Sequence, residues 1–472
     1  MTAQTILPAN SVTGGFNVGN SVRFNRADSA ILNKTFDDDG THHDKGTISL
    51  WIKRSELGAE EVLFSAGANN REFIRFETND TLTYRSVAES YHLNTNRVFR
   101  DISAWYHIVV AFDSSQGTAS NRNKIYVNGV QETSFATETY TPNQNMDHKL
   151  LSGELNSLGK DSEQNAFAAC YFCEVVGIDG VAHAPTSFGE FDEDSGIWKP
   201  ISVSGLTFGT NGFHLNFADS SALGTDVSGN GNNFANTNLA ATDQSTDTCT
   251  NNFATMSSIN NNNFAGGTFA EGNLQVTSRN TGYSYNVATV GVANGKWYWE
   301  VKWSAQNTGS TNQVLIGVAK RPTSSTTNYL GVTAWGYGYQ GSDGNVLLSN
   351  SALIGYASYS VGDIIGVALD MDNNRLYFSK NGTYNNSSDP ANGTNPISIT
   401  AADSVAGDSG FYFPAFGDGN SNLIQTAQFN FGAGPPYAIS SGNADGDGFG
   451  NFEFAVPSGY FALCTKNLAE YG

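Results

Sequence analysis

Paired carboxylates are the first residues in this sequence that could carry out chemistry. Two Asp or Glu side chains can hydrolyse a glycosidic bond, one as the acid and the other as the base or nucleophile. The nearest pattern to a catalytic strand of the form E-x-D-x-x-E is residues 190–195, EFDEDS, where Ser195 replaces the final carboxylate. Asp194-Ser195-Gly196 also indicates a turn. We therefore interpret this segment as a solvated acidic loop and predict that the chain is not an enzyme.

Cysteines are the second candidates, because Cys170 and Cys173 have the C-x-x-C spacing of redox and zinc sites. They lie in residues 168–180, AACYFCEVVGIDG, which has the composition of a β-strand. Residues three apart on a strand face opposite sides, so the two thiols cannot easily share a metal or bond each other. We predict that these thiols, like Cys249 and Cys464, are buried and reduced, and that the chain needs no cofactor.

Oxygen-rich segments that could hold a cation occur at residues 37–44 (DDDGTHHD), 219–232 and 445–456. The first is interpreted as a solvated charge run, and the last has Val456 where a calcium loop requires Glu. In the middle segment Asp219 and Asp226 lie in a Gly-rich loop, where calcium and a turn held by side-chain hydrogen bonds are alternatives. The turn is favoured, so no metal site is predicted.

Three aromatic residues, Trp335, Tyr337 and Tyr339, alternate with glycine, and Asp343 follows them. On a strand the three rings share one face. If that face is exposed, the rings and Asp343 form a ligand-binding platform for a sugar; if it faces inward, they belong to the core, which is slightly favoured. The same segment matches G-x-G-x-x-G at residues 336–341, but no helix follows, so the mechanism of nucleotide binding is absent.

Composition and charge restrict the partners. The 472 residues carry a formal charge of −20, with 51 Gly and only 14% charged residues. Such a surface repels nucleic acids and anionic membranes, so we predict neither nucleic-acid binding nor membrane insertion. Residues 1–11 have no basic region followed by an apolar one, so no signal peptide is expected.

Short apolar or alternating runs, separated by Gly, Asn, Asp and Ser, predict an all-β protein. Asn128-Gly129 indicates a tight hairpin. Residues 219–233 and the tract 260–263 are polar and Gly/Asn-rich, so we predict one domain at 1–235, a connection at 236–272 and a second domain at 273–472. The strands expected are 21–25, 46–53, 61–66, 72–77, 105–113, 124–130 and 169–178 in the first domain, and 274–278, 296–303, 313–319, 363–370, 375–380, 411–416 and 425–431 in the second.

The second domain resembles the SPRY domain, a concanavalin-like β-sandwich used for binding. The resemblance rests on ordered motifs across residues 273–434, which are GKWYWEV (295–301), IGVA (316–319), VGDIIGV (361–367), LYFSKNG (376–382), YFPA (412–415) and FNFG (429–432). In the first of these, Trp297, Trp299 and Val301 point to one side of a strand and Tyr298 and Glu300 to the other. Most of the motif residues are therefore expected to be structural.

The first domain resembles the laminin-G-like jelly roll. The motifs that carry this likeness are TISLWIK (47–53), WYHIVVAFD (105–113), IYVNG (125–129) and the strand 170–178 with Glu174. The two resemblances together imply two concanavalin-like antiparallel β-sandwiches, or jelly rolls, joined by an Asn/Gly-rich connection.

The combination of both domains is similar to structural proteins of tailed phages, especially marine ones. The shared patterns are at residues 50–55, 174–200, 206–217, 226–233 and 457–465. This resemblance implies a virion surface protein, made in the host cytoplasm, which we expect to be a tail-fibre or receptor-binding component that recognises a host-surface carbohydrate or protein. The alternatives are a capsid decoration or head-fibre protein and a polysaccharide-degrading enzyme, the latter disfavoured. Other virion proteins are expected partners, and we expect a homo-oligomer, although no heptads predict a stalk.

Overall fold

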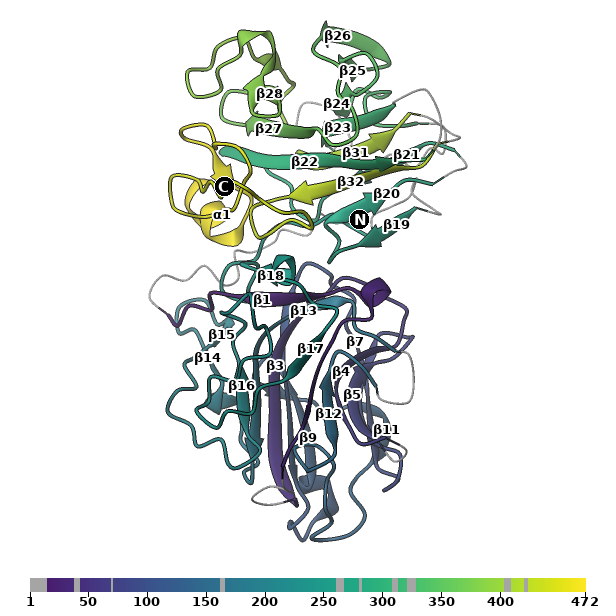
Figure 1. Cartoon of the computed structure of the whole chain (residues 1–472), viewed down its shortest axis with the longest axis vertical. Coiled ribbons are helices and arrows are strands. Elements are labelled where there is room, and N and C mark those ends of the chain that lie inside the picture. The colour runs from purple at the N-terminus through teal and green to yellow at the C-terminus, as the bar shows by residue number, and fades with distance from the viewer. Residues whose placement is uncertain are drawn as a thin grey trace. The chain divides into compact units, whose positions relative to one another are not determined.

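The structure is a computed structural model that describes residues 15–37, 43–68, 71–161, 166–259, 267–279, 282–307, 313–320, 328–402, 409–419 and 423–472. Its internal contacts form two units, one ending at Asn252 and the other beginning at Phe253. Both units consist of antiparallel β-sheets (Figure 1), which confirms the expected all-β class. The only α-helix in the described ranges is α1 (Thr465–Tyr471), and none of the described helices is long and apolar enough to span a membrane.

The first unit contains two eight-stranded sheets and a two-stranded one. In the first sheet the strand order is β10-β9-β8-β3-β13-β1-β18, and β16 also pairs with β13. The bounds are β1 Ser21–Phe24, β3 Lys45–Arg54, β8 Trp105–Asp113, β9 Asn123–Val127, β10 Val130–Gln131, β13 Cys170–Asp179, β16 Phe213–Leu215 and β18 Gln244–Ser245. The two-stranded sheet pairs β14 (Gly189–Phe191) with β15 (Trp198–Pro200).

The second sheet of this unit has the order β11-β7-β6-β5-β4-β12-β2-β17. Its strands are β2 Ile31–Thr35, β4 Glu61–Ala66, β5 Glu72–Phe76, β6 Thr81–Ser86, β7 His92–Val98, β11 Phe135–Thr139, β12 Leu155–Leu158 and β17 Ala235–Thr237. Short 3₁₀ turns occur at η1 Arg26–Asp28, η2 Ala119–Asn121, η3 Pro185–Ser187 and η4 Ala241–Asp243.

The core of the first unit lies between its two large sheets, because alternate side chains of each strand point inward. In β3, Ile48, Leu50 and Ile52 join this core, whereas Trp51 points to the outer face. That outer face is covered by later segments of the chain, and Trp198 and Cys249 are among the buried residues that contact it. The outer face of the other large sheet carries the candidate site described below.

The second unit contains a nine-stranded and a six-stranded sheet. The first has the order β19-β20-β32-β22-β27-β28-β29, with β30 on β28 and β33 parallel to β22. Its strands are β19 Thr268–Ala270, β20 Gln275–Thr277, β22 Lys296–Gln306, β27 Ile364–Asp370, β28 Arg375–Lys380, β29 Thr383–Tyr384, β30 Ile397–Ser398, β32 Gln425–Asn430 and β33 Phe461–Ala462; η5 is Asn385–Ser387. The other sheet, β21-β31-β23-β24-β25-β26, contains β21 Ser284–Val287, β23 Val314–Ala319, β24 Gly336–Gln340, β25 Asn345–Leu348, β26 Ser351–Gly355 and β31 Phe413–Asp418.

Strand β22 has the two faces that its sequence predicts. Trp297, Trp299 and Val301 lie in the core between the sheets, and Tyr298 packs in a separate cluster on the outer face. Glu300 also points outward, where it is fully buried and accepts hydrogen bonds from the backbone N–H groups of residues 453 and 454 at 2.9 and 2.8 Å. The C-terminal segment therefore covers this face of the sheet.

The boundary between the units differs from the connection expected at residues 236–272. Residues 235–237 form β17, which pairs with β2, and residues 244–245 form β18, which pairs with β1. Phe253, by contrast, is buried in the second unit. The polar composition of this segment suggested a linker. However, the side chains of Asn236, Asn238 and Thr248 donate hydrogen bonds to backbone carbonyl oxygens of the first unit. The Asn-rich tract 260–263 lies outside the described residues.

Candidate functional site

The aromatic strand at residues 335–339 is not an exposed platform. Tyr337 and Tyr339 in β24 are 1% and 0% exposed and belong to the core between the sheets. Trp335 is half-buried, and the exposed Asp343 accepts two hydrogen bonds from Asn345 in a turn. The four residues therefore do not make one surface.

The glycines of β24 explain why its rings point inward. Gly336 and Gly338 face the other side of the sheet, where Leu330 lies directly over them, and a Cβ atom on either glycine would approach Leu330 within 2.8 to 3.1 Å. That side can hold only glycine, so the tyrosines occupy the core. The next stretch, residues 341–360, contains the edge hairpin of β25 and β26.

The cysteines lie where the strand assignment places them. Cys170 is buried in the core between the sheets of the first unit, and Cys173 is buried in the cluster on the opposite face of β13. Burial raises the pKa of the Cys170 thiol well above its ordinary value. All four cysteines are free and buried, and within the described ranges no group of three His, Cys, Asp or Glu side chains is placed to hold a metal ion.

The loop at residues 219–233 is held by hydrogen bonds that occupy the oxygens of Asp226. Its carboxylate accepts four bonds, from the backbone N–H groups of His214, Ser228 and Asn232 and from the Ser228 hydroxyl, at 2.8 to 2.9 Å. Asn232 donates in turn to the carbonyl oxygens of Thr210 and Gly212. Through these bonds the carboxylate joins its own loop to His214 in β16. The first oxygen-rich segment falls largely on residues 38–42, outside the described residues.

The acidic segment at residues 190–195 is a hairpin between β14 and β15. Asp192 accepts hydrogen bonds from the Ser195 N–H and hydroxyl groups and from Lys199. These bonds, that of the Ser195 backbone first, lower the pKa of Asp192 to about 2. This carboxylate stays ionised in a turn, which is the structure that the sequence predicted.

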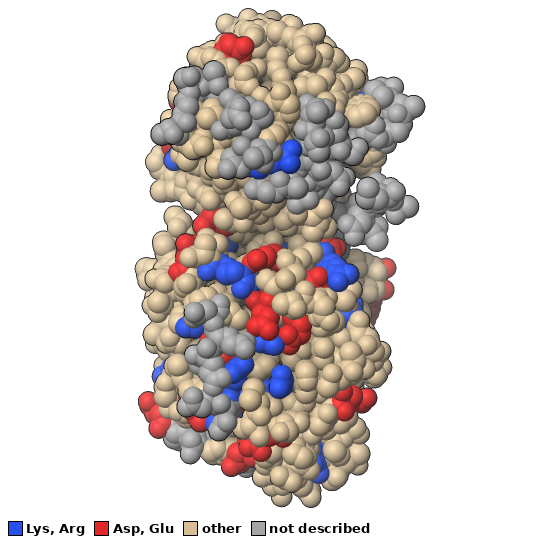
Figure 2. All heavy atoms as spheres, turned by 90° about the vertical axis from the view of Figure 1, so that its right-hand side faces the viewer, with Lys and Arg blue, Asp and Glu red and all other residues tan. Residues whose placement is uncertain are grey.

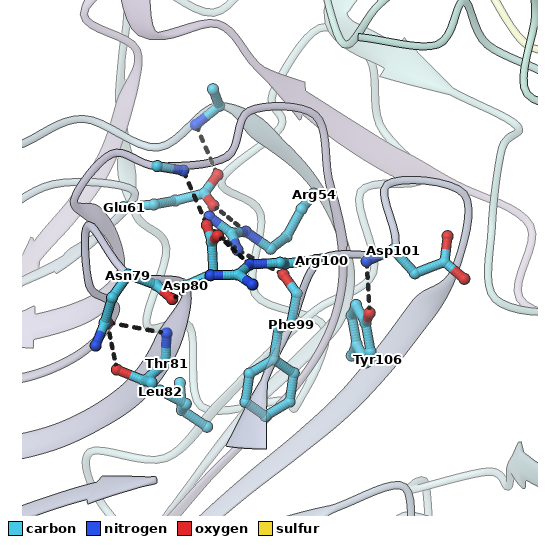
Figure 3. A network of polar contacts seen from close by, with 12 residues as sticks. Arg54, Glu61, Asn79, Asp80, Thr81, Leu82, Phe99, Arg100, Asp101 and Tyr106 are labelled. Atoms are coloured by element: carbon cyan, nitrogen blue, oxygen red, sulfur yellow. Dashed lines mark hydrogen bonds and ion pairs between the residues drawn. The ribbon is translucent and has the colours of Figure 1, made fainter. Parts of the chain in front are cut away.

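A buried ion-pair network near one end of the first unit has a structural role (Figure 3). Arg54 donates from Nε to Glu61 at 2.9 Å and from Nη1 to Asp80 at 3.1 Å and to the carbonyl oxygen of Phe99 at 2.6 Å. Arg100 also binds Asp80, at 2.8 Å. Arg54 and Glu61 are almost completely buried, so no ligand reaches them, and the network joins β3, β4 and two loops.

The outer face of the sheet β11-β7-β6-β5-β4-β12-β2-β17 carries a cluster of basic residues that the sequence analysis did not identify. We call it the arginine face and define it by Arg71, Phe73, Arg75, Arg85 and His92. Phe73 on β5 pairs with Arg85 on β6, and Arg85 pairs with His92 on β7, so these three lie side by side across three strands. Arg71 and Arg75 are two residues before and after Phe73 and share its face.

Phe73 is the centre of the arginine face. The guanidinium carbons of Arg71 and Arg75 lie 5.5 and 4.7 Å from the centre of its ring, within the range of a cation–π contact. Its ring is 1% exposed, although it points away from the core. Phe73 therefore supports the guanidinium groups that surround it.

The basic residues of this face differ in their partners. Arg71 pairs with Asp161 at 2.6 Å, and Arg75 pairs with Glu77 at 2.9 Å and Glu60 at 3.0 Å. Arg85 is half-buried, and among the described residues its side chain forms neither a hydrogen bond nor an ion pair. Nε2 of His92 is buried and equally without a hydrogen-bond partner in that part of the chain.

Of the three arginines of the arginine face, Arg85 is the one whose side chain has no carboxylate partner among the described residues. Burial lowers the pKa of His92, and the neighbouring charges of Arg85 and Arg75 lower it further, against an opposite contribution from Glu77. His92 is therefore neutral at pH 7, with one ring nitrogen available as a donor and the other as an acceptor. Figure 2 shows one side of the molecule, on which Lys and Arg side chains are interspersed with Asp and Glu side chains. Phe73, Arg71 and Arg75 are 1%, 8% and 7% exposed, so the half-buried Arg85 is the group through which this face can bind a ligand by a charged hydrogen bond.

Two carboxylates on the same face deserve comparison with a catalytic pair. Glu60 and Glu77 both contact Nη2 of Arg75. Glycoside hydrolysis needs one carboxyl group that carries a proton while the other is charged. Both side chains instead pair with one guanidinium group, which is the arrangement of an ion-pair network.

A signal for this face was present in the sequence. Arg71, Phe73 and Arg75 alternate along one predicted strand, so their common face could be inferred. Whether these residues lie beside Arg85 and His92, however, depends on the register of three strands, and the register cannot be inferred from the sequence.

Comparison with known families supports both domain resemblances. Residues 27–175 match the family model described as the concanavalin A-like lectin/glucanases superfamily, and residues 296–433 match the SPRY domain. The chain thus has an N-terminal concanavalin-like domain and a C-terminal SPRY domain, both of which are binding folds. No curated protein matches the chain.

Solved structures similar to parts of the chain include the SPRY domain of human HERC1. It has 22% identity, covering 33% of this chain and 87% of that one, with a TM-score of 0.26. A putative carbohydrate binding protein from Bacteroides ovatus has 14% identity, covering 47% of this chain and 58% of that one, with a TM-score of 0.32. A further human SPRY domain has 16% identity, 33% and 90% coverage and a TM-score of 0.24.

Proposed function

We propose that this chain is a non-enzymatic carbohydrate-binding protein that holds its ligand on the arginine face of the first unit. The observation that carries the proposal is the half-buried Arg85 with His92 beside it, both without partners among the described residues. Removing a charged or polar group from water is unfavourable unless another group compensates it. A bound ligand would supply that compensation.

Carbohydrate is the ligand class that we favour. The first domain matches a superfamily whose description includes lectins. Hydroxyl groups donate and accept, so a sugar hydroxyl can accept a hydrogen bond from the guanidinium group of Arg85. In the second unit, by contrast, the rings of Tyr337 and Tyr339 are buried.

The test is binding of the full chain to immobilised polysaccharides, neutral and acidic, measured by retardation in affinity electrophoresis. We expect retardation by at least one of them, and we expect no new reducing ends in the incubated polysaccharide. Failure to bind any polysaccharide would contradict the proposal. Release of reducing ends that Glu60→Gln or Glu77→Gln abolishes would instead establish the hydrolase.

We also propose that the protein is exposed on a virus particle, with carbohydrate binding as attachment to the host. The support is the set of phage-like patterns along the chain, two of which, at 206–217 and 226–233, form the interlocked loops around Asp226. Images of the parent particle labelled with an antibody to this chain would test it. Label on the tail fits a receptor-binding component, label on the head fits a decoration protein, and no label contradicts the proposal.

A further inference from the structure

We infer that the ligand of the arginine face is acidic, a polysaccharide with carboxylate or sulfate groups, and that Arg85 binds its anionic group. This inference rests on the proposed function and names its ligand class. The three guanidinium groups of the arginine face differ in whether a protein carboxylate pairs with them. Arg71 and Arg75 have protein carboxylates as partners, whereas Arg85 has none within the described residues.

The part of the chain that forms this face is less acidic than the rest. The protein carries −20 overall, whereas residues 51 to 100 contain seven Lys and Arg residues and seven Asp and Glu residues, so their formal charges balance. Three of these basic residues are the arginines of this face. A negatively charged polymer is repelled less here than by the rest of the surface, and the guanidinium group of Arg85 attracts its anionic group at short range, because charges act over about 8 to 10 Å at physiological salt.

The form of the arginine side chain fits this ligand. A guanidinium group presents parallel N–H donors that match the two oxygens of a carboxylate or sulfate. Arg85 is fixed between Phe73 and His92 on the neighbouring strands, so its position is set by the sheet. His92 next to it is neutral, so Arg85 supplies the positive charge at this point of the sheet.

The experiment compares Arg85→Gln with Arg97→Gln in the full chain. Arg97 is a matched control, because it lies on β7 of the same sheet, is exposed and pairs with Glu132 at 2.7 Å. Both variants lose one positive charge. The probes are alginate as the carboxylated polymer, heparin as the sulfated polymer and dextran as the neutral one, with affinity measured by calorimetry and by electrophoresis.

We expect the unaltered protein to bind alginate or heparin more tightly than dextran and to lose affinity as salt is added. Arg85→Gln should weaken that binding at least about tenfold, as the loss of a charged hydrogen bond does, and Arg97→Gln less than about twofold. Arg85→Lys, which keeps the charge but not the paired donors, should fall between them. The melting temperature of Arg85→Gln should equal or exceed that of the unaltered protein, because no intramolecular partner is lost.

Three outcomes would contradict the inference, and they differ in what they say about carbohydrate binding and about the role of Arg85. Equal binding by Arg85→Gln and Arg97→Gln overturns the inference, and so does a preference for dextran, but in both cases carbohydrate binding itself stands. If the unaltered protein binds none of the three polymers, the inference and the proposed function both fail. A lowered melting temperature in Arg85→Gln would show a structural role for Arg85 and would also count against the inference.

Discussion

At the scale of single residues, Glu72 has the most unusual surroundings. It is fully buried and accepts hydrogen bonds from Tyr84 at 2.6 Å, from Nδ1 of His148 at 3.0 Å and from the backbone N–H of Lys149 at 2.7 Å. Burial alone would raise its pKa, but His148 and the hydroxyl groups of Tyr84 and Tyr91 outweigh burial and lower the pKa to about 2. Glu72 therefore joins β5 to the loop of His148 only while it is ionised.

The first prediction concerns acid stability. The pKa of Glu72 is depressed in the folded protein from an ordinary 4.5. The stabilisation, on the order of 3 kcal/mol, is therefore present above pH 4.5 and is lost as the pH falls toward 2. We expect Glu72→Gln to destabilise the first unit by about 3 kcal/mol at pH 7 and to flatten this part of the pH profile, as measured by denaturant unfolding.

Glu154→Gln is the control for this prediction. Glu154 pairs with Lys149 at 2.7 Å on the surface, where such pairs contribute less than about 1 kcal/mol. An acid profile unchanged in Glu72→Gln would show that other carboxylates determine acid stability.

The second prediction separates the core from the surface in the segment 335–343. Tyr337→Ala should destabilise the second unit by about 4 kcal/mol, because it leaves a cavity in the core and removes the hydroxyl oxygen that accepts a hydrogen bond from the Thr400 N–H at 3.1 Å. Asp343→Ala, in an exposed turn, should change stability by less than about 0.5 kcal/mol. Thermal unfolding of both variants measures the difference, and equal melting temperatures would contradict the assignment.

At the scale of elements, the loops around Asp226 act as one unit. The motif at 226–233 supplies acceptors and amide donors, and the motif at 206–217 supplies N–H and carbonyl groups to them. Two patterns twenty residues apart in the sequence are thus one structural feature.

The third prediction tests this feature. Asp226→Ala removes the acceptor of four hydrogen bonds, so we expect a loss of about 2 to 4 kcal/mol in the first unit. Addition of calcium or of a chelator should leave the melting temperature of the unaltered protein the same, because the oxygens of Asp226 already have donors. A rise in melting temperature with calcium that Asp226→Ala abolishes would make the loop a cation site after all.

The bounds of several strands could be predicted from the sequence, whereas the direction in which a strand faces could not. Strands 61–66, 105–113 and 375–380 have the expected bounds, because each is a hydrophobic or alternating run ended by turn residues. Asn128 and Gly129 both have positive φ, 48° and 79°, as a tight hairpin requires. Alternation told us that Tyr337 and Tyr339 share a face, but which face is inward depends on Leu330, which covers the glycines.

Short strands were harder to predict than long ones. The strands at 235–237 and 244–245 have only two or three residues and a polar composition, so nothing in their sequence distinguishes them from a linker. The arginine face was missed for a related reason, since it is assembled from residues on three strands whose register is a property of the fold.

At the scale of the whole molecule, the chain is two sandwiches whose boundary lies between Asn252 and Phe253. The last residues of the first unit are fastened to it by buried polar contacts. Lys53 donates to Asp247 at 2.8 Å and to Asn252 at 2.7 Å, and Trp105 also donates to Asp247, at 3.2 Å. Lys53 and Asp247 are each 1% exposed.

The fourth prediction uses these contacts to locate the boundary with fragments. Residues 1–252 and 253–472 should each unfold cooperatively when expressed separately, since each has its own core. A fragment ending at residue 235 loses Asp247 and leaves the charge of Lys53 buried without its carboxylate, which should lower stability by about 3 to 5 kcal/mol relative to residues 1–252. A fragment beginning at residue 273 loses Phe253 and Met256, 2% and 0% exposed, and should likewise be less stable than residues 253–472. Denaturant unfolding of the four fragments measures these differences. If residues 1–235 are as stable as 1–252, the contacts of Asp247 contribute little to the first sandwich. If residues 273–472 are as stable as 253–472, the contacts of Phe253 contribute little to the second, and in either case the residues removed belong to a connection.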